Sequence, residues 1–148
     1  MANQFDFRRV QIRLQQAEKG LSLALANIAK NDFLDNFREQ GFNGQKWKEV
    51  QRRTAGTKAY AGNKDIGKRT RAILQGKGSG RLRKDVANSV SNGRKNSELS
   101  YTLVVDNEYA SYHNEGTSKI PKRQFVGMTE KLNKKILNKI NEKFSKIW

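Results

Sequence analysis

The sequence predicts an α+β fold in a single domain spanning residues 1–148. Amphipathic helical patterns occupy both ends of the chain, and a stretch of alternating apolar residues typical of a small antiparallel sheet lies between them. A long basic, glycine-rich segment separates the first helical pattern from the strand pattern. We therefore expect N-terminal helices, a small antiparallel β-sheet, a long basic Gly-rich loop and a C-terminal amphipathic helix packed on the sheet. A length of 148 residues suits one domain of this kind.

Residues 7–39 are expected to be helical. Their apolar and small side chains recur at spacings of three and four, which places them near one helix face. Gly20 either divides this stretch into two helices or is tolerated within one, and Gly41 is a plausible helix stop. The positions that define the face are Phe7, Val10, Leu14, Ala17, Leu21, Leu25, Ile28, Phe33 and Phe37.

Residues 41–84 are expected to form a long basic Gly-rich loop. The chain has a formal net charge of +16, and residues 41–95 hold fifteen Lys or Arg residues against three Asp or Glu residues. Eight of the twelve glycines lie from Gly41 to Gly80. Glycine loses much backbone entropy on ordering, and like charges repel, so the loop should be mobile in the free monomer. It should order against a polyanion or an acidic protein surface. The alternative is a solvated loop that aids solubility.

Residues 85–127 are expected to be rich in β-structure. Alternating side chains predict a strand at 99–105, and a weaker pattern suggests another at 86–91. Asn92-Gly93 would begin the hairpin connection between them. A helical turn at 109–115, ended by Gly116, precedes an extended stretch through Phe125.

Residues 129–147 are expected to form the C-terminal helix. Thr129 is a plausible N-cap, and Glu130 suits the positive end of the helix dipole. Apolar residues recur every four positions from Leu132 to Phe144, and six lysines cover most of the remaining surface. This apolar stripe should pack on the sheet or on the N-terminal helix, although such helices can also lie on membranes.

The composition excludes several classes of protein. The chain has no cysteine and one histidine, which excludes disulfide frameworks and thiolate zinc sites. No apolar run approaches the roughly 20 residues of a membrane span, and the first residues do not resemble a signal peptide. The mean hydropathy is −0.89, and 9% of residues are aromatic, which argues against wholesale disorder.

No motif predicts catalysis, a cofactor or a metal site. Residues 62–69 nearly match a phosphate-binding loop, but Arg69 stands where a Ser or Thr must reach magnesium. His113, with Glu115 nearby, could act as a general base in a small hydrolase or nuclease. A general base needs a partner that orients it, and adjacency in the sequence does not supply one. The alternative is a structural histidine that makes a hydrogen bond at a turn.

Four blocks in order resemble the phage virion morphogenesis family, the Mu-like tail-completion or neck proteins of tailed phages. The first runs from Phe37 through Gly44 and Trp47 to Thr54. The remaining blocks are ILQGKGSGRLRKDV at 73–86, YASYHNEG at 109–116 and PKRQFVG at 121–127. They are similar to the family's patterns IL…TG-x-L-R, YA-x-x-H-x-x-G and P-x-R-x-F-x-G.

The resemblance implies a non-enzymatic structural virion protein. Such a protein would form a homo-oligomeric ring, of six subunits in our expectation, at the head–tail junction, as a tail-completion protein, tail terminator or head–tail connector. Its partners would be further copies of itself and neighbouring neck, tail-tube or connector proteins, with DNA in the channel as another possible contact and no membrane. It would reside in the virion, and in the host cytoplasm during assembly. The alternative is a non-specific nucleic-acid-binding basic protein, which the pI near 10.3 favours.

The hypothesis of a structural virion protein predicts a set of assembly residues. Trp47 and Tyr60 would be aromatic anchors for a partner, and the basic side chains around them would meet its acidic surface. His113 would tie a loop to the backbone, and Arg123 would pair with an acidic group. The residues of the last two blocks would support either the monomer alone or a subunit contact as well. The full set is Trp47, Arg52, Arg53, Tyr60, Lys68, Arg69, Tyr109, Tyr112, His113, Arg123 and Phe125.

Overall fold

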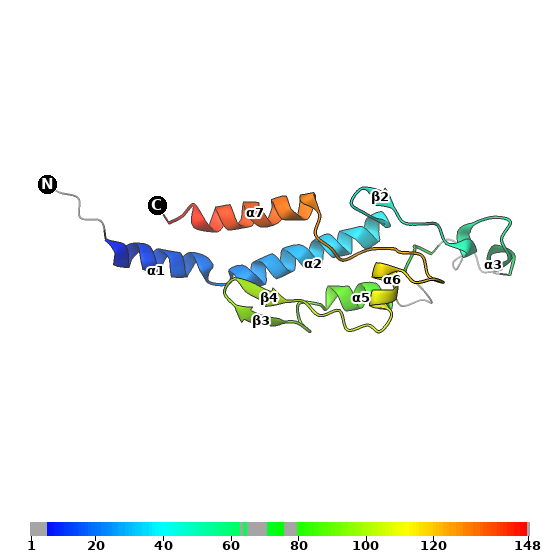
Figure 1. The fold of residues 1–148 in the computed structure, drawn as a ribbon, viewed down its shortest axis with the longest axis horizontal. Coiled ribbons are helices and arrows are strands. Elements are labelled where there is room, and N and C mark those ends of the chain that lie inside the picture. The colour runs from blue at the N-terminus through cyan, green and yellow to red at the C-terminus, as the bar shows by residue number, and fades with distance from the viewer. Residues whose placement is uncertain (1–5, 63, 65–70, 76–79, 148) are drawn as a thin grey trace.

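The computed structural model describes residues 6–62, 64, 71–75 and 80–147. Helices and two small antiparallel hairpins form an elongated body, and the first helix projects at one end (Figure 1). The α+β class predicted from the sequence is confirmed.

The helical prediction for residues 7–39 is confirmed, with a break at Gly20. Helix α1 (Phe7–Glu18) begins at Asp6, whose carboxylate accepts a hydrogen bond of 3.2 Å from the amide of Arg9. Helix α2 (Leu21–Glu39) follows Gly20, which has a φ of 73°. Left-handed backbone of this kind costs glycine nothing, so this residue separates the two helices.

Helix α2 receives its N-terminal cap from a distant turn. The amide of Gly20 donates to the Glu98 carboxylate at 2.9 Å, and the amide of Ser22 donates to the Glu98 main-chain carbonyl at 2.9 Å. Lys95 also contacts this carboxylate. The hydrogen bonds from Lys95 and Gly20 lower the pKa of Glu98 below its ordinary value. One side chain thus joins the hairpin tip to the start of α2.

The two hairpins are short. Strand β1 (Gly41–Phe42) pairs with β2 (Gln45–Lys46), and β3 (Arg94–Ser97) pairs with β4 (Ser100–Thr102). Of the strand predicted at 99–105, only residues 100–102 pair in a ladder. The residues after it leave the hairpin, as the amide of Val104 donates to the carbonyl of Ser89 at 2.9 Å.

The strand predicted at 86–91 is wrong. Helix α5 (Arg81–Ala87) occupies the first part of that stretch, and turns follow it. Leu82 and Val86 lie one helical turn apart, and both are buried in the core that α5 shares with α2. A spacing of four places both side chains on one face of a helix. Burying that face stabilises the helix more than the weak alternating pattern at 86–91 could stabilise a strand.

The predicted hairpin connection at Asn92-Gly93 is also wrong. The turn between β3 and β4 lies at Glu98 and Leu99 instead. Gly93 precedes β3, and a Cβ placed there would come within 2.1 Å of the Thr102 carbonyl oxygen. The glycine therefore permits a close backbone approach and does not form the hairpin turn.

Residues 41–62 are not the unstructured loop that their composition predicts. They contain β1, β2, the 3₁₀ helix η1 (Gln51–Arg53) and helix α3 (Lys58–Ala61). Trp47 is buried, and its amide donates to the Gln40 carbonyl at 2.8 Å. The remainder of the predicted loop lies partly outside the described residues.

The two helices predicted in the last third of the chain, at 109–115 and 129–147, are confirmed. Helix α6 (Ala110–Glu115) ends at Gly116, and helix α7 (Glu130–Phe144) begins after Thr129. The Thr129 hydroxyl accepts a hydrogen bond of 3.1 Å from the Leu132 amide. No helix in the described ranges is long and apolar enough to cross a membrane.

Helix α7 packs on the N-terminal helices and not on the sheet. It contacts α2 and α1, whereas the β3–β4 hairpin contacts α2 from the other side (Figure 1). The three-residue strand β4 has too little surface to cover a helix of fifteen residues. The longer α2 therefore takes the central position in the fold.

The core lies between three helices, α2, α5 and α7, and two non-helical segments that carry Trp47 and Phe125. Phe37 is fully buried; its ring meets Trp47 edge-on at 5.7 Å and Phe125 at 5.1 Å between ring centres. Such aromatic pairs add to the stabilisation that area burial gives. The buried cluster consists of Phe33, Phe37, Trp47, Ile73, Leu82, Val86, Phe125 and Leu132.

Candidate binding surface

The segment Pro121–Gly127 is held against α2 and the chain after β2. The indole Nε1 of Trp47 donates to the Gln124 carbonyl at 2.7 Å, and the amide of the Asn36 side chain donates to the Phe125 carbonyl at 2.9 Å. Trp47 and Phe125 are only 7% and 1% exposed. These two predicted assembly residues are therefore core residues of the monomer.

Helix α6 holds the same segment from its other side. The Asn114 side-chain oxygen accepts hydrogen bonds from the amides of Phe125 and Val126, both at 3.0 Å. The amide of Arg123 donates to the His113 carbonyl at 2.8 Å. The third and fourth sequence blocks are thus joined by one bond between their backbones and by two bonds from the backbone of the fourth to the Asn114 side chain.

Arg123 does not pair with an acidic group as predicted. It is 7% exposed, its Nε donates to the Lys48 carbonyl at 3.0 Å, and it takes part in none of the ion pairs found in the described part of the chain. Burial and the nearby Arg52 lower the pKa of Arg123, while Glu49 raises it. This arginine fixes the chain through a carbonyl oxygen.

The His113 imidazole does not tie a loop to the backbone within the described residues. Its Nδ1 is buried and has no hydrogen-bond partner there. Burial, and secondly the charge of Arg123, lower the pKa of His113. The residue is therefore neutral at neutral pH, and its main-chain carbonyl makes the connection that was expected of the side chain.

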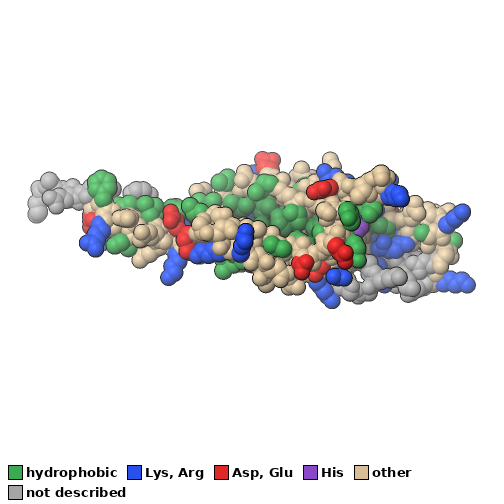
Figure 2. All heavy atoms as spheres, turned by 60° about the horizontal axis from the view of Figure 1, so that its bottom comes forward, with side chains coloured by type: hydrophobic (Ala, Val, Ile, Leu, Met, Phe, Trp, Pro, Cys, Tyr) green, Lys and Arg blue, Asp and Glu red, His purple; other side chains and the backbone are tan. Residues whose placement is uncertain are grey.

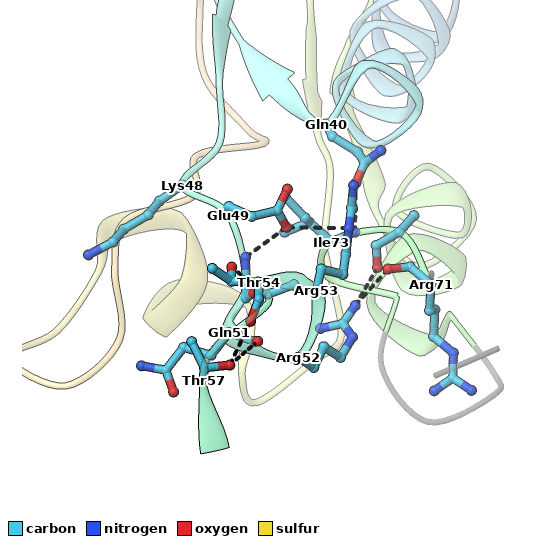
Figure 3. A network of polar contacts seen from close by, with 12 residues as sticks. Gln40, Lys48, Glu49, Gln51, Arg52, Arg53, Thr54, Thr57, Arg71 and Ile73 are labelled. Atoms are coloured by element: carbon cyan, nitrogen blue, oxygen red, sulfur yellow. Dashed lines mark hydrogen bonds and ion pairs between the residues drawn. The ribbon is translucent and has the colours of Figure 1, made fainter. Parts of the chain in front are cut away.

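Arg52 belongs to a polar network that joins η1 to the chain at 71–73 (Figure 3). Its Nη2 donates to the carbonyls of Arg71 and Ala72, both at 2.9 Å. Burial lowers the pKa of Arg52, and the charges of Arg53 and Arg71 lower it further. The chain at 71–72 is thus held by an arginine whose own charge is opposed by those of two neighbouring arginines.

Arg53 extends this network to the end of α2. Its Nη1 donates to the Gln40 side-chain oxygen at 2.9 Å, which also accepts the amide of Ile73 at 2.8 Å (Figure 3). Its Nε lies 3.3 Å from the Glu49 carboxylate. Arg52 and Arg53 consequently make internal contacts, and charge reversal at either position would disturb the fold as well as any partner.

The remaining predicted residues lie on the surface or outside the described ranges. Tyr109 and Tyr112 are 49% and 52% exposed, and Tyr60 is half-buried on α3. Lys68 and Arg69 lie outside the described residues. The two exposed tyrosines on or beside α6 are available for a subunit contact, whereas Trp47 is not.

A shallow groove with a volume of about 250 Å³ lies beside the buried Trp47. Its walls come from the β1–β2 hairpin, the residues after it and the segment that Trp47 holds. Among the residues that the structure describes, three lysines and no carboxylate line it, and the Lys46 ammonium donates to the Glu39 carbonyl at 2.7 Å. The lining residues are Phe42, Gln45, Lys46, Trp47, Lys48, Lys122 and Gln124.

The described residues bring no catalytic or metal-binding set together. In those ranges, no group of three or more His, Cys, Asp or Glu side chains could hold a metal ion. Glu115 is exposed, and no hydrogen bond between its side chain and His113 is found there. What the groove beside Trp47 does offer is exposed lysine side chains, which are cations that attract anions.

Sequence reasoning missed the amides that organise this region. Gln40 and Asn114 each accept two hydrogen bonds from backbone or side-chain groups of other segments. Asn114 follows His113 in the third block, but it falls on an unspecified position of the pattern YA-x-x-H-x-x-G, so the pattern gave no signal for it. Lys122 carries no signal of its own, because only the fold brings it beside Lys46 and Lys48.

Comparison of the chain with family models, with curated proteins and with solved structures finds no match in any of the three.

Proposed function

We propose that this protein is a non-enzymatic assembly protein of a tailed-phage particle, acting as a ring at the head–tail junction. The single observation that carries the proposal is that the four blocks resembling phage virion morphogenesis proteins converge in one packed unit. A chance resemblance spread over the chain gives no reason for such convergence. The contacts among the blocks support a shared structural role.

The contacts join every block to the same core. Trp47 of the first block donates to Gln124 of the fourth, and the third block binds the fourth through Asn114. Ile73 and Leu82 of the second block lie in the buried cluster with Trp47 and Phe125. The blocks are therefore explained as the residues that build this fold, whatever surface meets the partner.

The surface that we assign to self-association is the apolar stripe of α1. Ala17 is 8% exposed, Leu14 is 37% exposed and Phe7 is 77% exposed, so the stripe emerges from the body toward the N-terminal end. Hydrophobic side chains accordingly reach the end of the molecule formed by α1, where basic side chains lie beside them, and basic side chains also gather around α3 at the opposite end (Figure 2). Exposed apolar faces of this kind commonly mark protein contacts.

An apolar stripe on the helix that projects at one end of the molecule favours a head-to-tail arrangement. A contact between different surfaces of identical subunits closes into a ring when the rotation allows it. The neighbouring neck, tail-tube or connector proteins would then bind the faces of that ring. Ring size and neighbours are part of the proposal and follow from the resemblance.

The self-association test compares two double variants of α1 with equal added charge. Val10→Lys with Leu14→Lys alters the stripe, and Gln11→Lys with Gln15→Lys alters exposed positions beside it. We expect only the stripe variant to reduce the oligomer mass measured by light scattering after gel filtration. A wild-type protein that stays monomeric at all concentrations contradicts self-association through this face.

The location test uses the phage or prophage that encodes the chain. Deleting the gene should leave filled heads and tails that do not join, or tails of irregular length, in electron micrographs. Labelled antibody should bind complete particles between head and tail. Normal infectious particles without the protein would overturn the proposed function.

A further inference from the structure

We propose that the groove beside Trp47 is a binding site for the phosphodiester backbone of nucleic acid. The site consists of Lys46 on β2, Lys48 two residues later, and Lys122 on the segment held by α6. This inference does not depend on the phage assembly role. A phage assembly protein and a non-specific nucleic-acid-binding protein would both encounter this ligand.

The charge of the lining is the first argument. Lys46, Lys48 and Lys122 are exposed side chains that border one hollow, and no Asp or Glu is among the lining residues. Like charges that border one hollow repel, and an anion between them offsets that repulsion. A phosphate group supplies that anion, and binding it releases condensed counterions from the nucleic acid.

The rigidity of the groove is the second argument. Arg123 donates to the Lys48 carbonyl, the Trp47 indole donates to the Gln124 carbonyl, and Lys46 is held at the Glu39 carbonyl. The first two bonds fix the backbone at Lys48 and near Lys122, and the third positions the Lys46 ammonium, before any ligand arrives. A site ordered in advance avoids part of the entropy cost of binding.

The size of the groove is the third argument. At about 250 Å³ it is smaller than the ~300–1,000 Å³ typical of pockets that enclose a small molecule. A groove of this size suits one phosphate and its sugar from a chain that continues past the site. The net charge of +16 would draw such a polyanion from a distance.

The character of the groove favours nucleic acid over an acidic protein. Of its two aromatic side chains, Trp47 is only 7% exposed and packed in the core, so it cannot serve as an anchor for a protein partner, and Phe42 is half-buried. Protein interfaces are depleted in lysine and depend on buried aromatic anchors. Lysines are point charges well suited to phosphate oxygens, whose position varies along a flexible chain.

The test measures binding of a fluorescent DNA duplex of about 20 base pairs by anisotropy across a range of salt concentrations. The groove variant carries Lys46→Gln, Lys48→Gln and Lys122→Gln. The matched control carries Lys134→Gln, Lys143→Gln and Lys146→Gln on and after α7, which removes the same charge from residues that do not line the groove. Circular dichroism verifies that both variants fold.

We expect the groove variant to bind at least about tenfold more weakly, with a log–log salt slope smaller by roughly two to three, because each neutralised phosphate contributes about 0.9 to that slope. The control should keep a slope close to that of the wild type. Equal weakening in both variants would mean general charge attraction and would overturn the site. No duplex binding by the wild type, or tighter groove-dependent binding of poly-glutamate than of DNA, would overturn it also.

Discussion

The amide of Arg123 donates a hydrogen bond to the carbonyl oxygen of His113 at 2.8 Å, which joins a buried arginine to a half-buried histidine. The imidazole Nδ1 is itself buried and unbonded within the described residues. Burial and the charge of Arg123 together lower the pKa of His113. Folding therefore opposes protonation of this side chain.

Stability should fall in mild acid because of His113. Its pKa is lower in the folded state than in the unfolded state, so the unfolded state binds more protons and stability rises with pH. The contribution of His113 to the free energy of unfolding is complete above its unfolded-state pKa of about 6.5. It is lost as the pH falls from there through the lower pKa of the folded state. Urea unfolding from about pH 7 to about pH 5.5 should show a steeper loss for the wild type than for His113→Gln. Parallel curves would contradict this prediction.

Removing the Asn114 side chain should destabilise the monomer. Asn114→Ala leaves the amides of Phe125 and Val126 without their acceptor, and we expect a cost of about 2–4 kcal/mol. Asn114→Asp keeps an acceptor oxygen and should recover much of the loss. The exposed Asn138→Ala on α7 is the control and should stay within about 0.5 kcal/mol of the wild type in urea unfolding.

Trp47 should matter to the isolated monomer and not only to a partner. Trp47→Phe keeps a ring against Phe37 but loses the hydrogen bond to the Gln124 carbonyl, for an expected cost of about 1–2 kcal/mol. Trp47→Ala also empties the site and should cost about 3–5 kcal/mol. Thermal and urea unfolding of the monomer measure both. Unchanged monomer stability with impaired assembly would restore the interface role that the sequence predicted.

The Glu98 cap should give a second, more acidic pH dependence. The lowered pKa of Glu98 means that its contribution is present at neutral pH and is lost as the pH falls through the folded-state value. Glu98→Gln should therefore be less stable than the wild type at neutral pH, and the two should converge in acid. Hydrogen exchange at the Gly20 and Ser22 amides measures the local effect, with Glu108→Gln as a control at an exposed carboxylate.

Local patterns predicted the helices well because their signals lie within a few residues. The break at Gly20, the cap at Thr129 and the stop at Gly116 each depend on backbone conformation or a side chain nearby in sequence. Leu82 and Val86 carried an equally local signal, a spacing of four, which the strand interpretation overlooked. Reading that spacing would have predicted α5.

The rest of the fold depends on contacts between distant residues. Gly93 resembles a turn residue, but its role is set by the Thr102 carbonyl that the chain brings against it. Composition likewise suggested a mobile loop after Gly41, whereas burial of Trp47 and Ile73 orders part of it. Net charge and glycine content describe an average tendency, and two large apolar side chains are enough to override it locally.

Because Glu98 binds the first turn of α2 through both its carboxylate and its carbonyl, the length of the β3–β4 turn and the helix start at Gly20 are coupled. An insertion in that turn would release both amides at once and free the junction at which α1 changes direction. Natural variants of this chain should therefore alter the hairpin tip and the interhelix glycine together, and an engineered loop graft at the tip should reorient the N-terminal arm.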